Sequence, residues 1–177
     1  EISVNIDLNL ENFQDLYKFI KKVQIELVIV GPEKPLVEGL VDFLASKNIK
    51  VFGPRKKVAQ LEGSKIFTKK ICEKFNIPTA KFKICKSKEE AFIFLSSSNF
   101  PLVVKADVLA AGKGVYICQN VDEAKTAVNE IFDGKFGKAD QVLIEEFLEG
   151  DEMSFFIISD GISYKTFNTA QDHKRVG

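Results

Sequence analysis

The sequence carries no net charge and few cysteines, and both shortages exclude classes of protein. Its 25 basic and 25 acidic residues balance, so no long-range field favours nucleic acid or an acidic membrane as a partner. The three cysteines, Cys72, Cys85 and Cys118, stand far apart without a CxxC pair. This spacing is not that of a disulfide framework or a cysteine metal site, and it predicts free thiols in a reducing compartment.

Long apolar runs are missing as well. No run approaches the roughly 20 residues that a membrane-spanning helix needs, and the sequence does not open with a signal peptide. We therefore expect a cytoplasmic protein without a membrane partner. At 177 residues, of which 45% are hydrophobic and 28% charged, the chain can bury a core in one domain or in two small ones.

The first 57 residues alternate between helical and strand patterns. Residues 11–23 have apolar side chains at helical spacing, and 26–30 form a continuous apolar run that predicts a buried strand. Pro35 can start a second helix, and 49–53 predict another buried strand. The alternation predicts an α/β domain with a parallel sheet.

The pattern changes from residue 58 onward. Ser64 can cap a helix that runs to about Asn76, and Ser87 with Glu90 forms a capping box that opens another. Asp160-Gly161 predicts a two-residue hairpin turn. Further strands are expected at 101–106, 115–119 and 141–147, and a helix at 121–132.

A glycine-rich loop lies in the stretch "KADVLAAGKGV" (105–115). A Walker P-loop needs a glycine at position 107, where the sequence has Asp107, and a hydroxyl residue after Lys113. A dinucleotide fingerprint needs a third glycine and a following helix, but a strand is expected here. The loop therefore joins two strands. It can be a lid that holds a phosphate through backbone N–H groups and lysine, or a plain hairpin turn.

Other residues favour the phosphate interpretation. Lys65 is expected at a helix start and Lys105 at a strand end. About forty residues later, "IEEFLEGDE" (144–152) is an apolar strand ending in carboxylates. The segment Glu145–Leu148 could offer adenine a strand-like edge, and Glu152 could accept the hydroxyls of a ribose.

This order of motifs resembles the ATP-grasp superfamily, and within it the glycinamide ribonucleotide synthetase family. The resemblance is carried by "VIVGPEKPLVEGL", "FGP", "QLEGSKIFTK", "IPTA", "VVKADVLAAGKGV", "IEEFLEGDEMSF" and "QDHKRVG", which extend from residue 28 to the last residue. It implies that 1–57 are the C-terminal part of an N-terminal α/β domain with a partial parallel sheet. It also implies that 58–177 are an incomplete ATP-grasp domain of α+β type, with a mixed or antiparallel lid subdomain at about 79–147.

The resemblance implies a ligase of de novo purine biosynthesis. Such enzymes use ATP to convert glycine to glycyl phosphate, which the amine of 5-phosphoribosylamine attacks, giving glycinamide ribonucleotide, ADP and phosphate. Lys65 and Lys105 would hold ATP phosphates and act in catalysis. The remaining ATP contacts would be Ala111, Gly112, Lys113, Gly114, Glu145, Glu146, Phe147, Leu148 and Glu152. The phosphoribosylamine site would comprise Gly31, Pro32, Glu33, Asp172, His173, Lys174 and Arg175.

The sequence also departs from the family pattern. Val108 stands where the family usually has glycine, and a β-branched residue resists a positive φ. No counterpart is visible for the family's first glycine-rich strand–loop, its magnesium-binding acids or its C-terminal domain. We therefore expect Mg²⁺ ligands outside this stretch and no activity from this stretch alone. A monomer or dimer is expected. Another ATP-grasp ligase or carboxylase, or a non-catalytic nucleotide-binding module, are the alternatives.

Overall fold

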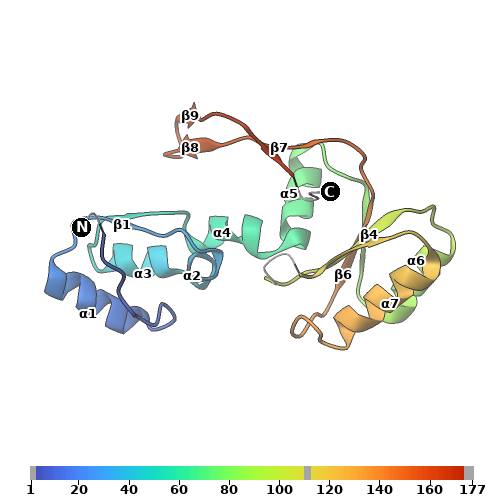
Figure 1. Cartoon of the computed structure of the whole chain (residues 1–177), viewed down its shortest axis with the longest axis horizontal. Coiled ribbons are helices and arrows are strands. Elements are labelled where there is room, and N and C mark those ends of the chain that lie inside the picture. Colours follow the sequence, from blue (N-terminus) through green and yellow to red (C-terminus); the bar gives the residue numbers. More distant parts are fainter. Residues whose placement is uncertain (1–2, 110–112, 174–177) are drawn as a thin grey trace. The chain divides into compact units, whose positions relative to one another are not determined.

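The computed structural model describes residues 3–109 and 113–173 (Figure 1). The chain divides into two compact units, residues 1–146 and 147–177. Within these ranges the fold is mixed α/β, with one parallel strand pair and three antiparallel sheets. No helix in the described ranges is long and apolar enough to cross a membrane.

The first part of the larger unit is built around a short parallel strand pair. Strand β1 (Val28–Ile29) pairs with β2 (Val51–Phe52). Three helices accompany it: α1 (Phe13–Val23), α2 (Glu33–Glu38) and α3 (Leu40–Ser46). Its buried core comprises Ile20, Val30, Leu40, Val41 and Leu44. The parallel pairing confirms the α/β character expected for this part of the chain.

Two details of this part differ from the sequence prediction. The helix expected to start at Pro35 starts at Glu33, and Gly39 divides it from α3 with a φ of +99° that favours glycine. The strands are shorter than expected and are not fully buried. Ile29 is 69% exposed because the side chains of β1 alternate between two faces and the core covers one of them.

Two helices follow the parallel pair. Helix α4 (Lys56–Gly63) was not predicted, whereas α5 (Lys65–Phe75) has the predicted ends. The Ser64 hydroxyl accepts the N–H of Phe67 at 3.0 Å, and Asn76 ends the helix in a left-handed conformation. These are the capping interactions that the sequence indicated.

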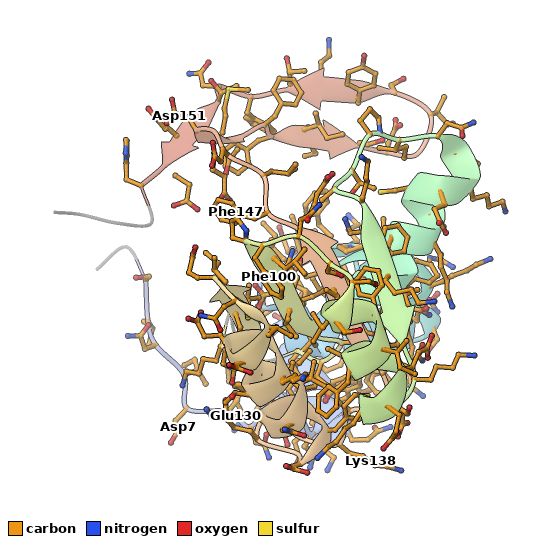
Figure 2. The ribbon with its side chains drawn as sticks, turned by 90° about the vertical axis from the view of Figure 1, so that its right-hand side faces the viewer. Asp7, Phe100, Glu130, Lys138, Phe147 and Asp151 are labelled. Atoms are coloured by element: carbon orange, nitrogen blue, oxygen red, sulfur yellow. The ribbon has the colours of Figure 1, made fainter. Side chains whose placement is uncertain are left out.

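The second part of this unit is a four-stranded antiparallel sheet in the order β3-β6-β4-β5. Its strands are β3 (Phe82–Cys85), β4 (Leu102–Ala106), β5 (Val115–Cys118) and β6 (Val142–Glu146). Helices α6 (Lys88–Ser96) and α7 (Val121–Phe132) lie side by side over one face (Figure 1). Figure 2 views the sheet from this helical side, with Glu130 of α7 labelled.

The two faces of this sheet have different roles. Val104, Ala106, Val142 and Ile144 belong to the core shared with α6 and α7. Because side chains alternate along a strand, the neighbouring residues of β4 and β6 point to the opposite face. That second face carries Val103, Lys105, Leu143 and Glu145, and so includes two of the predicted site residues.

The capping box of α6 forms in altered geometry. The Ser87 hydroxyl accepts the N–H of Glu90 at 3.2 Å, as predicted. The carboxylate of Glu90 accepts the backbone N–H of Lys86 at 2.8 Å, one residue before the position that a standard capping box uses. Both interactions still satisfy backbone donors at the start of the helix.

The smaller unit contains two antiparallel strand pairs. Strand β7 (Glu152–Ser154) pairs with β10 (Ala170–Asp172), and β8 (Ile157–Ser159) pairs with β9 (Tyr164–Thr166). The predicted hairpin is therefore present, but its turn is not the predicted two-residue turn. Ser159 pairs with Tyr164, which leaves a four-residue loop. The Asp160 carboxylate accepts the N–H groups of Ile162 and Ser163, and this local bonding stabilises the longer loop.

Candidate functional site

Lys105 and Glu145 meet on the sheet face opposite α6 and α7. The register pairs Val103 with Glu145 and Lys105 with Leu143, so Lys105 and Glu145 are diagonal neighbours on adjacent strands. Their charged groups lie 2.6 Å apart, from Lys105 Nζ to Glu145 Oε2. The side chain of Lys105 is 26% exposed and that of Glu145 is 6% exposed. The pair is therefore open to a ligand on the lysine side.

A second lysine, Lys69 of α5, contacts the other oxygen of the same carboxylate. Its Nζ lies 3.1 Å from Glu145 Oε1. The same ammonium group donates to Thr79 Oγ1 at 2.7 Å and to the Ala80 carbonyl at 3.0 Å. Lys69 was not among the site residues predicted from the sequence. The available signal was its spacing, because it lies four residues after Lys65 and thus on the same side of the helix.

Lys65 holds the end of strand β4. Its Nζ donates to the carbonyl oxygens of Ala106 at 3.0 Å and Val108 at 3.2 Å. Burial lowers the pKa of Lys65, and the nearby charge of Lys105 lowers it further, whereas Asp107 acts in the opposite direction. The influence of Lys105 means that the two lysines predicted to bind phosphate are close enough to interact.

Asp107 connects the same strand end to the start of α5. Its carboxylate accepts the Ser64 hydroxyl at 2.9 and 3.0 Å, and the backbone N–H of Ile66 at 3.1 Å. A carboxylate is favourable at a helix N-terminus, where backbone N–H groups lack helical partners. In the sequence this residue only excluded a P-loop. Its structural role depends on a partner 43 residues away, which no local pattern indicates.

Two lysines share one carboxylate on this sheet face. Lys69 and Lys105 each contact Glu145, so these three groups carry one net positive charge. Lys105 is the more accessible of the two lysines. The cluster is therefore suited to an anion.

The glycine-rich loop joins two paired strands. The Gly114 carbonyl accepts the N–H of Ala106 at 2.8 Å, so the ladder of β4 and β5 extends to the end of the loop. Lys113 is exposed and Gly114 is buried. The predicted contacts Ala111 and Gly112 lie outside the described residues. This geometry is common to a phosphate lid and a plain hairpin.

The predicted adenosine contacts fall in both units. Glu145 and Glu146 end β6, where the N–H of Glu146 donates to the Lys81 carbonyl at 3.0 Å. The Glu146 carboxylate accepts the Lys81 N–H at 2.8 Å. Phe147, Leu148 and Glu152 belong to the smaller unit. Because β6 has strand partners on both sides, its backbone is engaged in the sheet up to Glu146, where the strand ends.

The predicted phosphoribosylamine contacts also fall in both units. In the larger unit, Gly31 and Pro32 follow strand β1, and Glu33 is the exposed first residue of α2. In the smaller unit, Asp172 ends β10 and is the register partner of Glu152, with His173 exposed beside it. The predicted contacts Lys174 and Arg175 lie outside the described ranges.

Comparison with known proteins identifies the family. The N domain of phosphoribosylglycinamide synthetase matches residues 1–62, and the ATP-grasp (A) domain of the same enzyme matches residues 63–177. Phosphoribosylamine–glycine ligases of Mesorhizobium japonicum and Brucella melitensis are 46% and 48% identical to this chain. Each match covers 97% of this chain, but 41% and 40% of the relative.

Solved structures agree with this result. The crystal structure of a phosphoribosylamine–glycine ligase from Thermotoga maritima superposes with a TM-score of 0.79 at 31% identity, over 98% of this chain and 41% of that one. A biotin carboxylase domain from Hydrogenobacter thermophilus, solved with MgADP and bicarbonate, gives a TM-score of 0.73 at 25% identity, over 94% and 39%. The chain thus spans about 41% of the length of the ligases it matches. It belongs to the phosphoribosylglycinamide synthetase family and carries sequence of both its N domain and its ATP-grasp domain.

Proposed function

We propose that the full-length protein is an ATP-dependent ligase that joins glycine to 5-phosphoribosylamine. The products are glycinamide ribonucleotide, ADP and phosphate, and the reaction passes through glycyl phosphate, as expected from the sequence. The printed names of the relatives support this assignment. The structural observation that carries it is the accessible ammonium group of Lys105, which shares the carboxylate of Glu145 with the buried Lys69.

In this proposal Lys105 and Lys65 hold the phosphates of ATP. Within the described residues Glu145 is the one hydrogen-bond partner of Lys105 Nζ, and an ammonium group has three donors. Lys105 can therefore bind phosphate oxygens without leaving Glu145. The two carbonyl contacts of Lys65 would have to be exchanged for phosphate contacts. The loop with Ala111, Gly112, Lys113 and Gly114 would cover the phosphates.

The nucleoside would be held next to this cluster. The sheet face with Lys105 also carries Val115 and Ile117 of β5, each of which is 41% exposed. Such apolar side chains suit the faces of an adenine ring. We assign the edge of the base to the Glu145–Leu148 segment, including Glu146 and Phe147, and the ribose hydroxyls to Glu152.

Magnesium completes the chemistry in this class of reaction. Bound Mg²⁺ would neutralise the charge that develops on the transferred phosphoryl group. Among the described residues no three acidic, histidine or cysteine side chains are grouped to hold a metal ion. We propose that the carboxylates that hold Mg²⁺ together with the phosphates of ATP lie outside this stretch.

The remaining assignments follow the sequence. We place phosphoribosylamine on Gly31, Pro32, Glu33, Asp172, His173, Lys174 and Arg175. We also propose the division into 1–57 and 58–177, with the lid at about 79–147. The three cysteines are unpaired, which supports a reducing compartment such as the cytoplasm. A monomer or a dimer is compatible with this proposal.

The test is a product assay on the full-length protein. It is supplied with ATP, Mg²⁺, labelled glycine and phosphoribosylamine generated from ribose 5-phosphate and ammonia. We expect ADP release that requires both glycine and the amine, and label that appears in glycinamide ribonucleotide. ADP release with another acid, such as bicarbonate or D-alanine, would favour a different ATP-grasp enzyme. ATP binding without any product would favour a non-catalytic module.

A further inference from the structure

Lys69 and Glu145 are the two buried charged residues among those that the structure describes, with 7% and 5% of the whole residue exposed. Removing charges from water is costly unless they are paired and hydrogen-bonded. Lys69 satisfies this condition, because its Nζ donates to Thr79 and Ala80 and forms an ion pair with Glu145. Its ring contact with Phe82, 5.2 Å from Nζ to the ring centroid, encloses it further. Lys69 is therefore held by protein groups and is little accessible to a ligand.

Glu145 is shared between two lysines that differ in accessibility. Oxygen Oε1 faces Lys69, whose side chain is 9% exposed, and oxygen Oε2 faces Lys105, whose side chain is 26% exposed. If Lys105 were the sole cation at this carboxylate, the pair would be neutral, and an arriving phosphate would meet the negative charge of Glu145. With Lys69 behind the carboxylate, the three groups carry one net positive charge on the accessible side.

We propose that Lys69 is a positioning residue for nucleotide phosphates, which neutralises Glu145 from behind and so leaves the charge of Lys105 available to the ligand. This inference rests on the proposed function, because it takes the Lys105 site to be the phosphate site. Lys69 itself does not touch the nucleotide. Its effect passes through Glu145 to Lys105 and is electrostatic.

The test compares nucleotides that differ in charge. In the full-length protein, Lys69→Met should weaken ATP binding roughly tenfold, the scale of one uncompensated charge in a partly buried site. The loss should be smaller for ADP, smaller again for AMP, and absent for adenosine. Lys69→Arg keeps the charge and should restore most of the affinity. Lys70→Met removes an exposed lysine from the next position of the same helix and is the matched control.

Substitution of Glu145 tests the same charge balance without removing Lys69. Glu145→Gln keeps the shape of the side chain and removes its charge, so it should strengthen ATP binding relative to the unmodified protein. In the double variant Lys69→Met/Glu145→Gln, the net charge of the cluster returns to its original value. Its ATP affinity should recover to within a few-fold of the unmodified protein. If Lys69→Met alone does not fold, these variants still test whether the charge balance at Glu145 controls ATP binding.

Isothermal titration gives the dissociation constants, and circular dichroism verifies folding. A loss that rises from adenosine to ATP, together with recovery in the double variant, supports the inference. An equal loss for all four ligands would mean that Lys69 only maintains the local structure, and would overturn it. If Glu145→Gln weakens the binding of ATP but not that of adenosine, the inference is overturned as well, because adenosine reports any loss at the adenine edge. If the unmodified protein binds no nucleotide, the proposed function fails, and this inference fails with it.

Discussion

Replacing Asp107 with alanine should weaken the connection between the start of α5 and the end of β4. The carboxylate accepts the hydroxyl of Ser64 and the N–H of Ile66, and Lys65 bonds the carbonyls on either side of it. Alanine removes both acceptor oxygens and leaves the N–H of Ile66 without this partner. The Ser64 hydroxyl still accepts the N–H of Phe67, so the helix itself should persist.

The magnitude follows from the kind of bond that is lost. Hydrogen bonds to a charged group contribute about 1.5–3 kcal/mol, and a carboxylate at a helix N-terminus contributes about 0.3–1 kcal/mol. Because the two terms describe the same contacts, we expect a local loss of about 2 kcal/mol for Asp107→Ala. Asp107→Asn keeps an acceptor oxygen and should lose about 1 kcal/mol.

Amide hydrogen exchange measures this loss directly. A local loss of about 2 kcal/mol should accelerate exchange at Ile66 about 30-fold, since 1.4 kcal/mol corresponds to a factor of ten. Asp122→Ala is the matched control, because Asp122 is an exposed acid in the first turn of α7. It should leave Ile66 unchanged. If Asp107→Ala accelerates amide exchange at Ile66 no more than this control does, the bonds of Asp107 between β4 and α5 do not stabilise the start of α5.

Three further variants and one labelling experiment test other parts of the site. Lys105→Ala should lower turnover by about two to three orders of magnitude, because it removes a donor that stabilises transition-state charge. Lys138 is the control: its side chain is 91% exposed (Figure 2), and Lys138→Ala should leave turnover unchanged. Near-normal turnover of Lys105→Ala would show that Lys105 does not belong to the site. Arg175→Ala should raise the KM for phosphoribosylamine and leave the KM for ATP unchanged. A raised KM for ATP alone would show that this arginine belongs to the nucleotide site. Burial lowers the pKa of Lys65, so the folded chain loses this proton before the unfolded chain does. The free energy of unfolding of the unmodified protein, measured in urea relative to that of Lys65→Met, should therefore rise as the pH increases from the lowered pKa toward 10.5. A fall over this pH range would contradict the burial of Lys65. Burial raises the pKa of Cys85 and Cys118 to about 11. Iodoacetamide at pH 8 should therefore modify Cys72 in the native protein, and Cys85 and Cys118 only after unfolding. Rapid labelling of Cys85 in the native protein would contradict its burial.

Elements with local end signals were predictable from the sequence. Helix α5 begins after Ser64 and ends before Asn76, where the capping residues indicated. Helix α4 had no such signal. Its N-cap, Arg55, makes no side-chain cap, and the N–H of Lys56 is accepted at 2.7 Å by Asp42 of α3. A cap supplied by another helix depends on the tertiary fold, so local sequence did not indicate a helix at this position.

Part of the candidate site was also predictable, because some of its residues lie at element ends that the sequence indicates. Lys65 and Lys105 could be selected because each stands beside a recognisable element end and within a family motif. The roles of Lys69 and Asp107 depend on partners on other elements, Glu145 and Ser64. The contact of the Glu145 side chain with two lysines was not predictable either, because strand register decides which face a side chain occupies.

The most direct test of the account is a crystal structure of the full-length protein with a non-hydrolysable ATP analogue and Mg²⁺. We expect the ammonium groups of Lys105 and Lys65 at hydrogen-bond distance, about 2.7–3.2 Å, from phosphate oxygens. Glu145 should remain between Lys69 and Lys105, with the adenine beside the Glu145–Leu148 segment. An analogue whose phosphates lie away from the sheet face that carries Lys105 would contradict the central claim.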